Sequence, residues 1–193
     1  EAMPSLLTHR YLLFFFTLSL TIHFPLSAKV LHLNDTTTVV NAGSYIRYLE
    51  DVESKHSLND IQSPIIQQQF IQASQNLSKG YTNSTYWIRL DLRYTKTAEA
   101  QQDLSHSHPK EIIPSNLWFL DISYPLLDNI DIFIVSKTGP ITHIELGDSK
   151  PFDHRSIPAS SWLTPISVPE NETQTIYIKV KSTSSFQIPI SIR

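Results

Sequence analysis

A two-residue alternation of apolar and polar side chains restricts the fold of this chain more than any other feature. It is clearest in Thr85–Tyr94, where Ile88, Leu90 and Leu92 point to one side of an extended chain. The pattern recurs in Leu117–Ser123, Asn129–Ser136, Ile141–Leu146, Trp162–Val168, Thr175–Ser182 and Phe186–Ile192. Short strands at this spacing, without helical stretches between them, predict an all-β fold, either an antiparallel β-sandwich or a jelly roll.

The segment before Thr85 is less regular. Lys29–Val40 predicts an early strand or two, and Ser57–Asp60 has the pattern of a capped helical turn. Ser44–Asp51 is ambiguous, and the glutamine-rich Ile65–Asn76 fits either helix or extended chain. Two prolines qualify the later strands: Pro165 interrupts its segment, and Pro189 indicates an edge or end strand.

Length and composition favour one exported domain. The chain has 193 residues and a net charge of −3, so it lacks the basic face that nucleic acid requires. Cysteine is absent, which excludes disulfides, thiolate chemistry and cysteine-based zinc sites. A secreted eukaryotic domain often uses disulfides, so this balance favours a bacterial periplasmic protein.

The N-terminal 28 residues have the pattern of an export signal. Arg10 precedes the uncharged apolar run Tyr11–Ile22, and small residues at Ser27 and Ala28 suit a signal peptidase. We expect cleavage after Ala28, with an uncleaved anchor as the alternative. Residues 29–193 are then predicted to form a single periplasmic domain at the outer face of the inner membrane.

Motifs for catalysis are missing from the sequence. There is no serine elbow, no phosphate-binding glycine loop and no His-Glu-x-x-His helix, although paired carboxylates for glycoside hydrolysis stay open. We therefore expect no enzyme activity, no cofactor and no metal site. The metal candidates weighed and set aside are His106 with His108, and the carboxylates Asp128, Asp131, Asp148 and Asp153.

Residues 147–155 combine a turn with charged groups. Gly147 permits backbone geometry that other residues avoid, and Pro151 stiffens the approach to Phe152, a predicted packing anchor. Asp148 and Arg155 are then held at a fixed separation. They form either a ligand clamp or a salt bridge that fixes the loop.

The polar side of two strands offers a candidate binding face. One side of the first strand carries Trp87, Arg89, Asp91 and Arg93, and the corresponding side of another carries Tyr177, Lys179 and Lys181. An aromatic plate beside charged hydrogen-bonding groups suits a sugar ring. The alternative is that Trp87 fills a second layer of the sandwich and that the charges are ordinary solvated residues.

Several segments, in order, resemble one family. They are Tyr48–Asp51 with Ser57-Leu58, Gly80…Tyr86-Trp87-Ile88-Arg89-Leu90, Tyr124–Phe133, Gly147-Asp148…Pro151-Phe152…Arg155, Tyr177–Val180…Ser182 and Ile188–Ile190. Across roughly residues 44–193 the chain resembles the periplasmic sensor domain (type-two extracellular domain) of bacterial seven-transmembrane receptors with diverse intracellular signalling modules (7TM-DISM). The departures are Lys179, where the family tends to have Arg, and a longer loop at Thr97–Ser115.

This resemblance implies a jelly roll similar to carbohydrate-binding modules and a role as the input domain of a signal-transduction receptor. The transmembrane region and the output module of such a receptor are expected outside this chain. We predict binding of a small-molecule ligand, carbohydrate-like, through Trp87, Arg89, Asp148, Arg155 and Tyr177. The alternative is a non-catalytic surface or assembly module that binds another protein through a strand edge.

Overall fold

A computed structural model describes residues 29–97, 114, 116–137, 139–151, 155 and 157–193. The predicted signal segment, most of the loop at Thr97–Ser115 with His106 and His108, and Phe152 and Asp153 lie outside these residues. The first strands and helices are β1 (Val30–Leu33), β2 (Val40–Asn41), β3 (Arg47–Asp51), α1 (Leu58–Gln62), α2 (Pro64–Gln67), β4 (Ile71–Gln72), β5 (Leu77–Gly80) and β6 (Thr85–Tyr94). The remaining strands are β7 (Leu117–Ile122), β8 (Asn129–Val135), β9 (Thr142–Leu146), β10 (Trp162–Ser167), β11 (Thr173–Lys181), β12 (Phe186–Ile188) and β13 (Ile190–Ile192).

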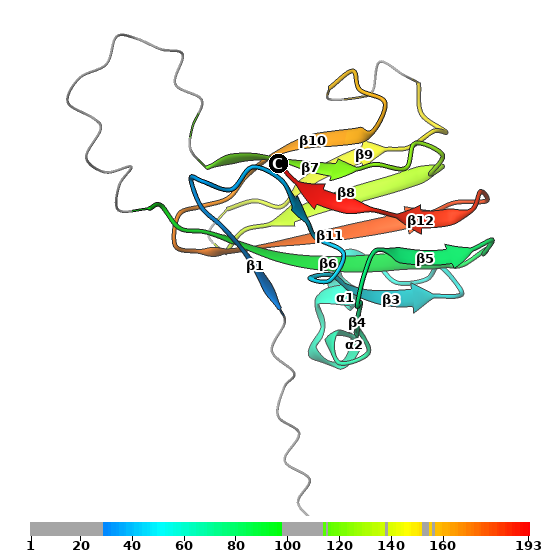
Figure 1. The fold of residues 1–193 in the computed structure, drawn as a ribbon. Coiled ribbons are helices and arrows are strands. Elements are labelled where there is room, and N and C mark those ends of the chain that lie inside the picture. Colours follow the sequence, from blue (N-terminus) through cyan, green and yellow to red (C-terminus); the bar gives the residue numbers. More distant parts are fainter. Residues whose placement is uncertain (1–28, 98–113, 115, 138, 152–154, 156) are drawn as a thin grey trace, which may run out of the picture.

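The strands form two main sheets. The larger, seven-stranded sheet has the order β4-β3-β6-β11-β8-β9, and its seventh strand, β1, pairs with β6 outside this order (Figure 1). The smaller, four-stranded sheet has the order β10-β7-β13-β2. The long strand β6 has two partners on one side: β3 pairs with its first half and β1 with its second half. The predicted all-β class is confirmed, and most pairs are antiparallel, although β1 runs parallel to β6. The jelly-roll connection pattern stays a prediction.

The main hydrophobic core contains the apolar residues that the alternation places on one side of each strand. Ile88, Leu90 and Leu92 of β6 are fully buried there, beside Ile176 and Ile178 of β11. The smaller sheet contributes Trp118, Leu120, Ile122, Ile166, Ile190 and Ile192 to the same cluster. Burial of each such side chain stabilises the fold by about 1.5–3 kcal/mol. The alternation therefore specifies which face of each sheet packs against the other sheet.

Proline positions agree with the pairing. Pro165 lies in β10, which is an edge of the smaller sheet and so tolerates a residue without an amide hydrogen. Pro189 divides the predicted last strand in two. The first half, β12, pairs with β5 in a separate two-stranded sheet, whereas the second half, β13, pairs with both β7 and β2.

The capped helical turn predicted at Ser57–Asp60 is confirmed as the start of α1, and α2 occupies the first part of the segment that fitted either helix or extended chain. Ser57 caps α1 by accepting a hydrogen bond from the Asp60 amide, and the Asp60 carboxylate accepts one from the Ser57 amide. This bonding lowers the pKa of Asp60. Pro64 begins α2 at the position where its missing amide hydrogen costs nothing. The helices lie on the face of the larger sheet away from the smaller sheet (Figure 1).

Gly147 adopts the backbone geometry expected from the sequence and also allows a close approach between two segments. Its φ of +128° lies in the region that side chains disfavour, and an added Cβ would come within 2.2 Å of the Asp128 carbonyl oxygen. Glycine is therefore required for the chain to leave β9 alongside the loop that precedes β8.

Candidate functional site

The outer face of the larger sheet carries the polar side of the alternation. Strand register places Arg89 of β6 beside Tyr177 of β11, and Tyr177 beside Phe133 of β8. Arg47 of β3 lies on the other side of Arg89. Because paired residues in antiparallel strands point to the same face, these side chains form a row across the sheet.

One part of this face, which we term the covered half, lies under α1 and α2. Trp87 is only 1% exposed and shares a second hydrophobic cluster with Leu49 and Tyr177 from the sheet and with Ile61 and Phe70. The Trp87 ring also stacks on Phe133, with ring centres 5.9 Å apart. The expectation of an exposed tryptophan plate is therefore wrong, and the alternative of a second buried layer describes Trp87 correctly.

Arg89 stands at the boundary of the covered half. Its Nε lies 3.0 Å from Asp91 Oδ2, and its Nη1 donates to the side-chain oxygen of Gln67 in α2. The Gln67 side-chain nitrogen donates in turn to the Tyr177 hydroxyl over 3.2 Å. The guanidinium carbon also lies 6.0 Å from the centre of the Tyr177 ring. These contacts connect the helices to the sheet through a single side chain, Gln67.

Burial shifts the pKa of two groups in this row. Burial raises the pKa of Tyr177, and its neighbour Arg89 opposes that shift. Burial lowers the pKa of Arg47, and the positive charge of Arg89 adds to that effect. Arg47 donates through Nη2 to the backbone carbonyls of Gln67 and Phe70, which fixes the end of α2 against β3.

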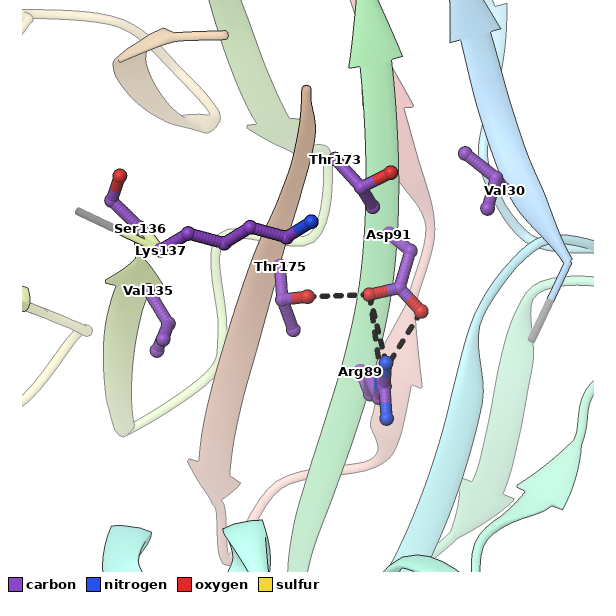
Figure 2. Close-up of a pocket in the computed structure, with 8 residues that line it drawn as sticks. All are labelled: Val30, Arg89, Asp91, Val135, Ser136, Lys137, Thr173 and Thr175. Atoms are coloured by element: carbon purple, nitrogen blue, oxygen red, sulfur yellow. Dashed lines mark hydrogen bonds and ion pairs between the residues drawn. The ribbon is translucent and has the colours of Figure 1, made fainter. Parts of the chain in front are cut away.

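Beyond Arg89 the outer face is not covered by the helices and contains a pocket of about 430 Å³, which we term the open half. Its lining comes from β1, β6, β11, the end of β8 and the residues that follow β8: Val30, Arg89, Asp91, Val135, Ser136, Lys137, Thr173 and Thr175. In Figure 2 the Lys137 side chain extends across β11 toward Asp91. The pocket thus presents two cationic groups, one carboxylate and several hydroxyls.

Asp91 is the central acceptor of the open half. Its side chain is 4% exposed, against 23% for that of Arg89. It accepts hydrogen bonds from Arg89 Nε and Nη2 and, over 2.6 Å, from the Thr175 hydroxyl (Figure 2). A carboxylate held by two neighbours keeps a fixed orientation, and its remaining lone pairs are available to a bound donor.

A second pocket of about 230 Å³ lies along residues 72–79 and Tyr48. Lys79 lies over the Tyr48 ring and donates to its hydroxyl over 3.2 Å. The lining of this second pocket is mostly polar and contains no carboxylate. The open half therefore offers the more complete set of binding groups.

The loop after β9 carries the other predicted site residues. Asp148 is exposed, and its amide donates to the Leu127 carbonyl. The Arg155 guanidinium lies 4.1 Å from the centre of the Trp162 ring and donates to the Ala159 carbonyl. Neither residue lines the pocket of the open half, so the structure groups Arg89 with Tyr177 and Trp87 but not with this loop.

Comparison with known protein families identifies the family of this chain. The family described as 7TMR-DISM extracellular 2 matches residues 43–193. The chain belongs to this family. It is an extracellular sensor domain of the receptor type, placed on the extracytoplasmic side of the membrane. No curated protein matches the chain.

The match begins within one residue of the boundary drawn from sequence motifs, which confirms the resemblance. Within the described residues of this 7TMR-DISM extracellular domain, no helix is both long enough and apolar enough to cross a bilayer.

Sequence reasoning missed part of the pocket of this 7TMR-DISM extracellular domain. The alternation places Asp91 on the same side as Arg89 and so includes it in the predicted face, although Asp91 was not among the five residues predicted to bind the ligand. The alternation also places Thr175 on the side of Tyr177, but only strand register brings it beside Asp91. Lys137 follows the end of β8 and carried no sequence signal. The two helices also left no sequence sign that they would cover Trp87.

Proposed function

We propose that this sensor domain binds a small, carbohydrate-like molecule in the open half of the larger sheet. The observation that carries the proposal is the pairing of a nearly buried carboxylate, Asp91, with Arg89 at the floor of a pocket. A buried ion pair at an open pocket is expensive to maintain, so such groups concentrate where a ligand uses them.

The lining suits a ligand with several hydroxyls. A hydroxyl donates to a carboxylate and accepts from a guanidinium or an ammonium, and Asp91, Arg89 and Lys137 supply these partners. Thr173 and Ser136 add groups that both donate and accept. Because Trp87 is buried, ring stacking contributes nothing here, and hydrogen bonds provide the recognition.

The size of the pocket agrees with this ligand class. Its volume of about 430 Å³ falls in the range of roughly 300–1,000 Å³ that is typical of small-molecule sites. Val30 and Val135 supply apolar walls, against which the carbon face of a sugar packs.

Ligand binding has a direct route to the helices. Arg89 bonds Asp91 in the pocket and Gln67 in α2, so a ligand that draws the guanidinium toward itself weakens the bond to α2. Signalling in a receptor requires that the ligand bind one of two arrangements of the domain more tightly than the other. The contact between Arg89 and Gln67 is where these two arrangements are proposed to differ. The domain itself is proposed to act without catalysis.

The other predicted residues have separate roles in this proposal. Tyr177 positions Arg89 from the covered half, and Trp87 shares a hydrophobic cluster with Tyr177 there; neither touches the ligand. Asp148 and Arg155 form a loop away from the pocket lining, and their predicted role as a ligand clamp is tested by the same experiment.

The test is a screen of monosaccharides and disaccharides by isothermal titration calorimetry with the purified chain. Lys137→Ala and Asp91→Asn are expected to weaken binding of any sugar that is found, by about tenfold or more, since each removes a charge-assisted hydrogen bond. Lys137→Ala is the cleaner variant because Lys137 is exposed and its loss leaves the fold intact.

Lys79→Ala in the second pocket and Arg155→Ala in the loop are the matched controls. Binding that survives Lys137→Ala and Asp91→Asn but is lost in Arg155→Ala would place the ligand in the loop instead. Binding of no sugar, together with capture of a protein partner through a strand edge, would favour an assembly module.

A further inference from the structure

The hairpin at the far edge of the larger sheet brings together three metal-binding side chains. Asp131 of β8 is the direct cross-strand partner of Glu145 of β9, and His143 lies two residues before Glu145 on the same face. Each offers one ligand atom, and these atoms all lie within 4.8 Å of one another. From the sequence alone, Asp131 is grouped only with other carboxylates, because strand register alone brings it beside His143 and Glu145.

We propose that Asp131, His143 and Glu145 bind one divalent transition-metal ion, with zinc as the best match. Two atoms bound to one zinc at about 2.0–2.2 Å are at most about 4.4 Å apart, so small side-chain rotations complete the site. An imidazole with carboxylates suits zinc, nickel or cobalt, whereas calcium and magnesium prefer oxygen ligands alone.

Neighbouring side chains hold His143 and Asp131 in place. The His143 ring stacks on Phe133, with ring centres 4.4 Å apart and planes 9° from parallel. His143 Nε2 lies 2.9 Å from Asp131 Oδ1, so both groups already converge. All three residues lie on the paired strands β8 and β9.

Lys150 is the competitor that the ion must displace. Its ammonium lies 2.6 Å from Glu145 Oε2, and the side chains are 34% and 52% exposed. An ion pair so open to solvent contributes little stability, so a divalent ion replaces the ammonium readily. Three protein ligands leave at least one coordination position to water or to a further ligand.

The test is calorimetric titration of the purified chain, without a polyhistidine tag, with zinc chloride, and with magnesium and calcium chloride for comparison. One zinc ion per chain is expected, with little or no response to the other two. His143→Ala and Glu145→Gln are each expected to weaken zinc binding by more than about tenfold, since even supporting residues around a metal have effects of that size.

The matched controls remove other histidines of the chain. His56→Ala and the double variant His106→Ala with His108→Ala are expected to keep wild-type affinity. Circular-dichroism melting of His143→Ala checks that the fold is intact. The proposal is overturned if the chain binds no zinc at a concentration of about 0.1 mM. It is also overturned if folded His143→Ala binds zinc as tightly as the wild type does, or if zinc binding is lost only in the double variant.

Discussion

The two halves of the outer face of the larger sheet are built from the same strands and differ in what lies above them. In the covered half, Trp87 and Tyr177 are buried under α1 and α2. In the open half, Asp91 and Thr175 line a pocket, only two to four residues farther along β6 and β11. Arg89 contacts both halves.

This comparison shows that one strand face can hold a second core and a polar site in succession. The alternation that places Trp87, Arg89 and Asp91 on one side does not distinguish between them. Whether each becomes core or site depends on an insert of two short helices between β3 and β4. The following predictions test that division.

Trp87→Ala is expected to have the largest effect. It removes the main side chain of the covered half and leaves a cavity beneath α1, which costs about 3–5 kcal/mol for a buried tryptophan. Urea unfolding measures the loss. Lys137→Ala in the open half is the control and should change stability by less than about 0.5 kcal/mol. A similar small loss for Trp87→Ala would mean that the helices do not pack on the sheet as described.

Arg89→Met is expected to have the second-largest effect on stability, because it removes the side chain that bonds both halves. Asp91 then keeps a nearly buried charge without its main partner, and breaking such a pair costs about 3 kcal/mol. Chemical denaturation measures the effect. Adding Asp91→Asn to Arg89→Met should recover part of the lost stability, since the unpaired charge is gone. A further loss in the double variant would contradict the assignment.

Thr175→Val is expected to cost less, about 1–2 kcal/mol, because Asp91 loses one hydrogen bond of 2.6 Å while Arg89 stays. Thr173→Val, on the same strand and in the same pocket, provides the comparison and should be nearly neutral. Thermal unfolding measures both. Equal effects at the two positions would show that the Thr175 hydroxyl has no special role in orienting Asp91.

The smallest effect is expected at Asp35, which lies outside both halves. The Tyr94 hydroxyl donates to it over 2.6 Å, and this bond, followed by that of the Thr97 amide, lowers its pKa below 3.8. Because the folded pKa is depressed, the stabilisation is present above pH 3.8 and is lost as pH falls through the folded pKa.

Asp35→Asn should therefore lower stability slightly at neutral pH and reduce its decline below about pH 4. Unfolding measured from pH 7 to pH 2.5 (about the range in which carboxylates titrate) provides the test. An unchanged acid dependence in Asp35→Asn would rule out this hydrogen bond as a source of it.

Much of the fold was predictable because short-range patterns decide it. The strands from Thr85 onward, the capped turn at Ser57 and the glycine requirement at Gly147 all agree with the structure. The candidate site was predictable only in part. Arg89 was identified from its strand and lines the pocket, but the predicted exposure of Trp87 was wrong and Lys137 was missed.

The sequence by itself determined which side of each strand faces the main core, because a two-residue period assigns side chains to faces without reference to distant residues. It also determined the family, through motifs in the correct order. Only the tertiary structure decided which part of the opposite face is covered, and which of Asp91, Thr175, Asp131 and His143 become neighbours. Strand register and the docking of α1 and α2 depend on contacts between distant segments, and a local pattern carries no record of those contacts.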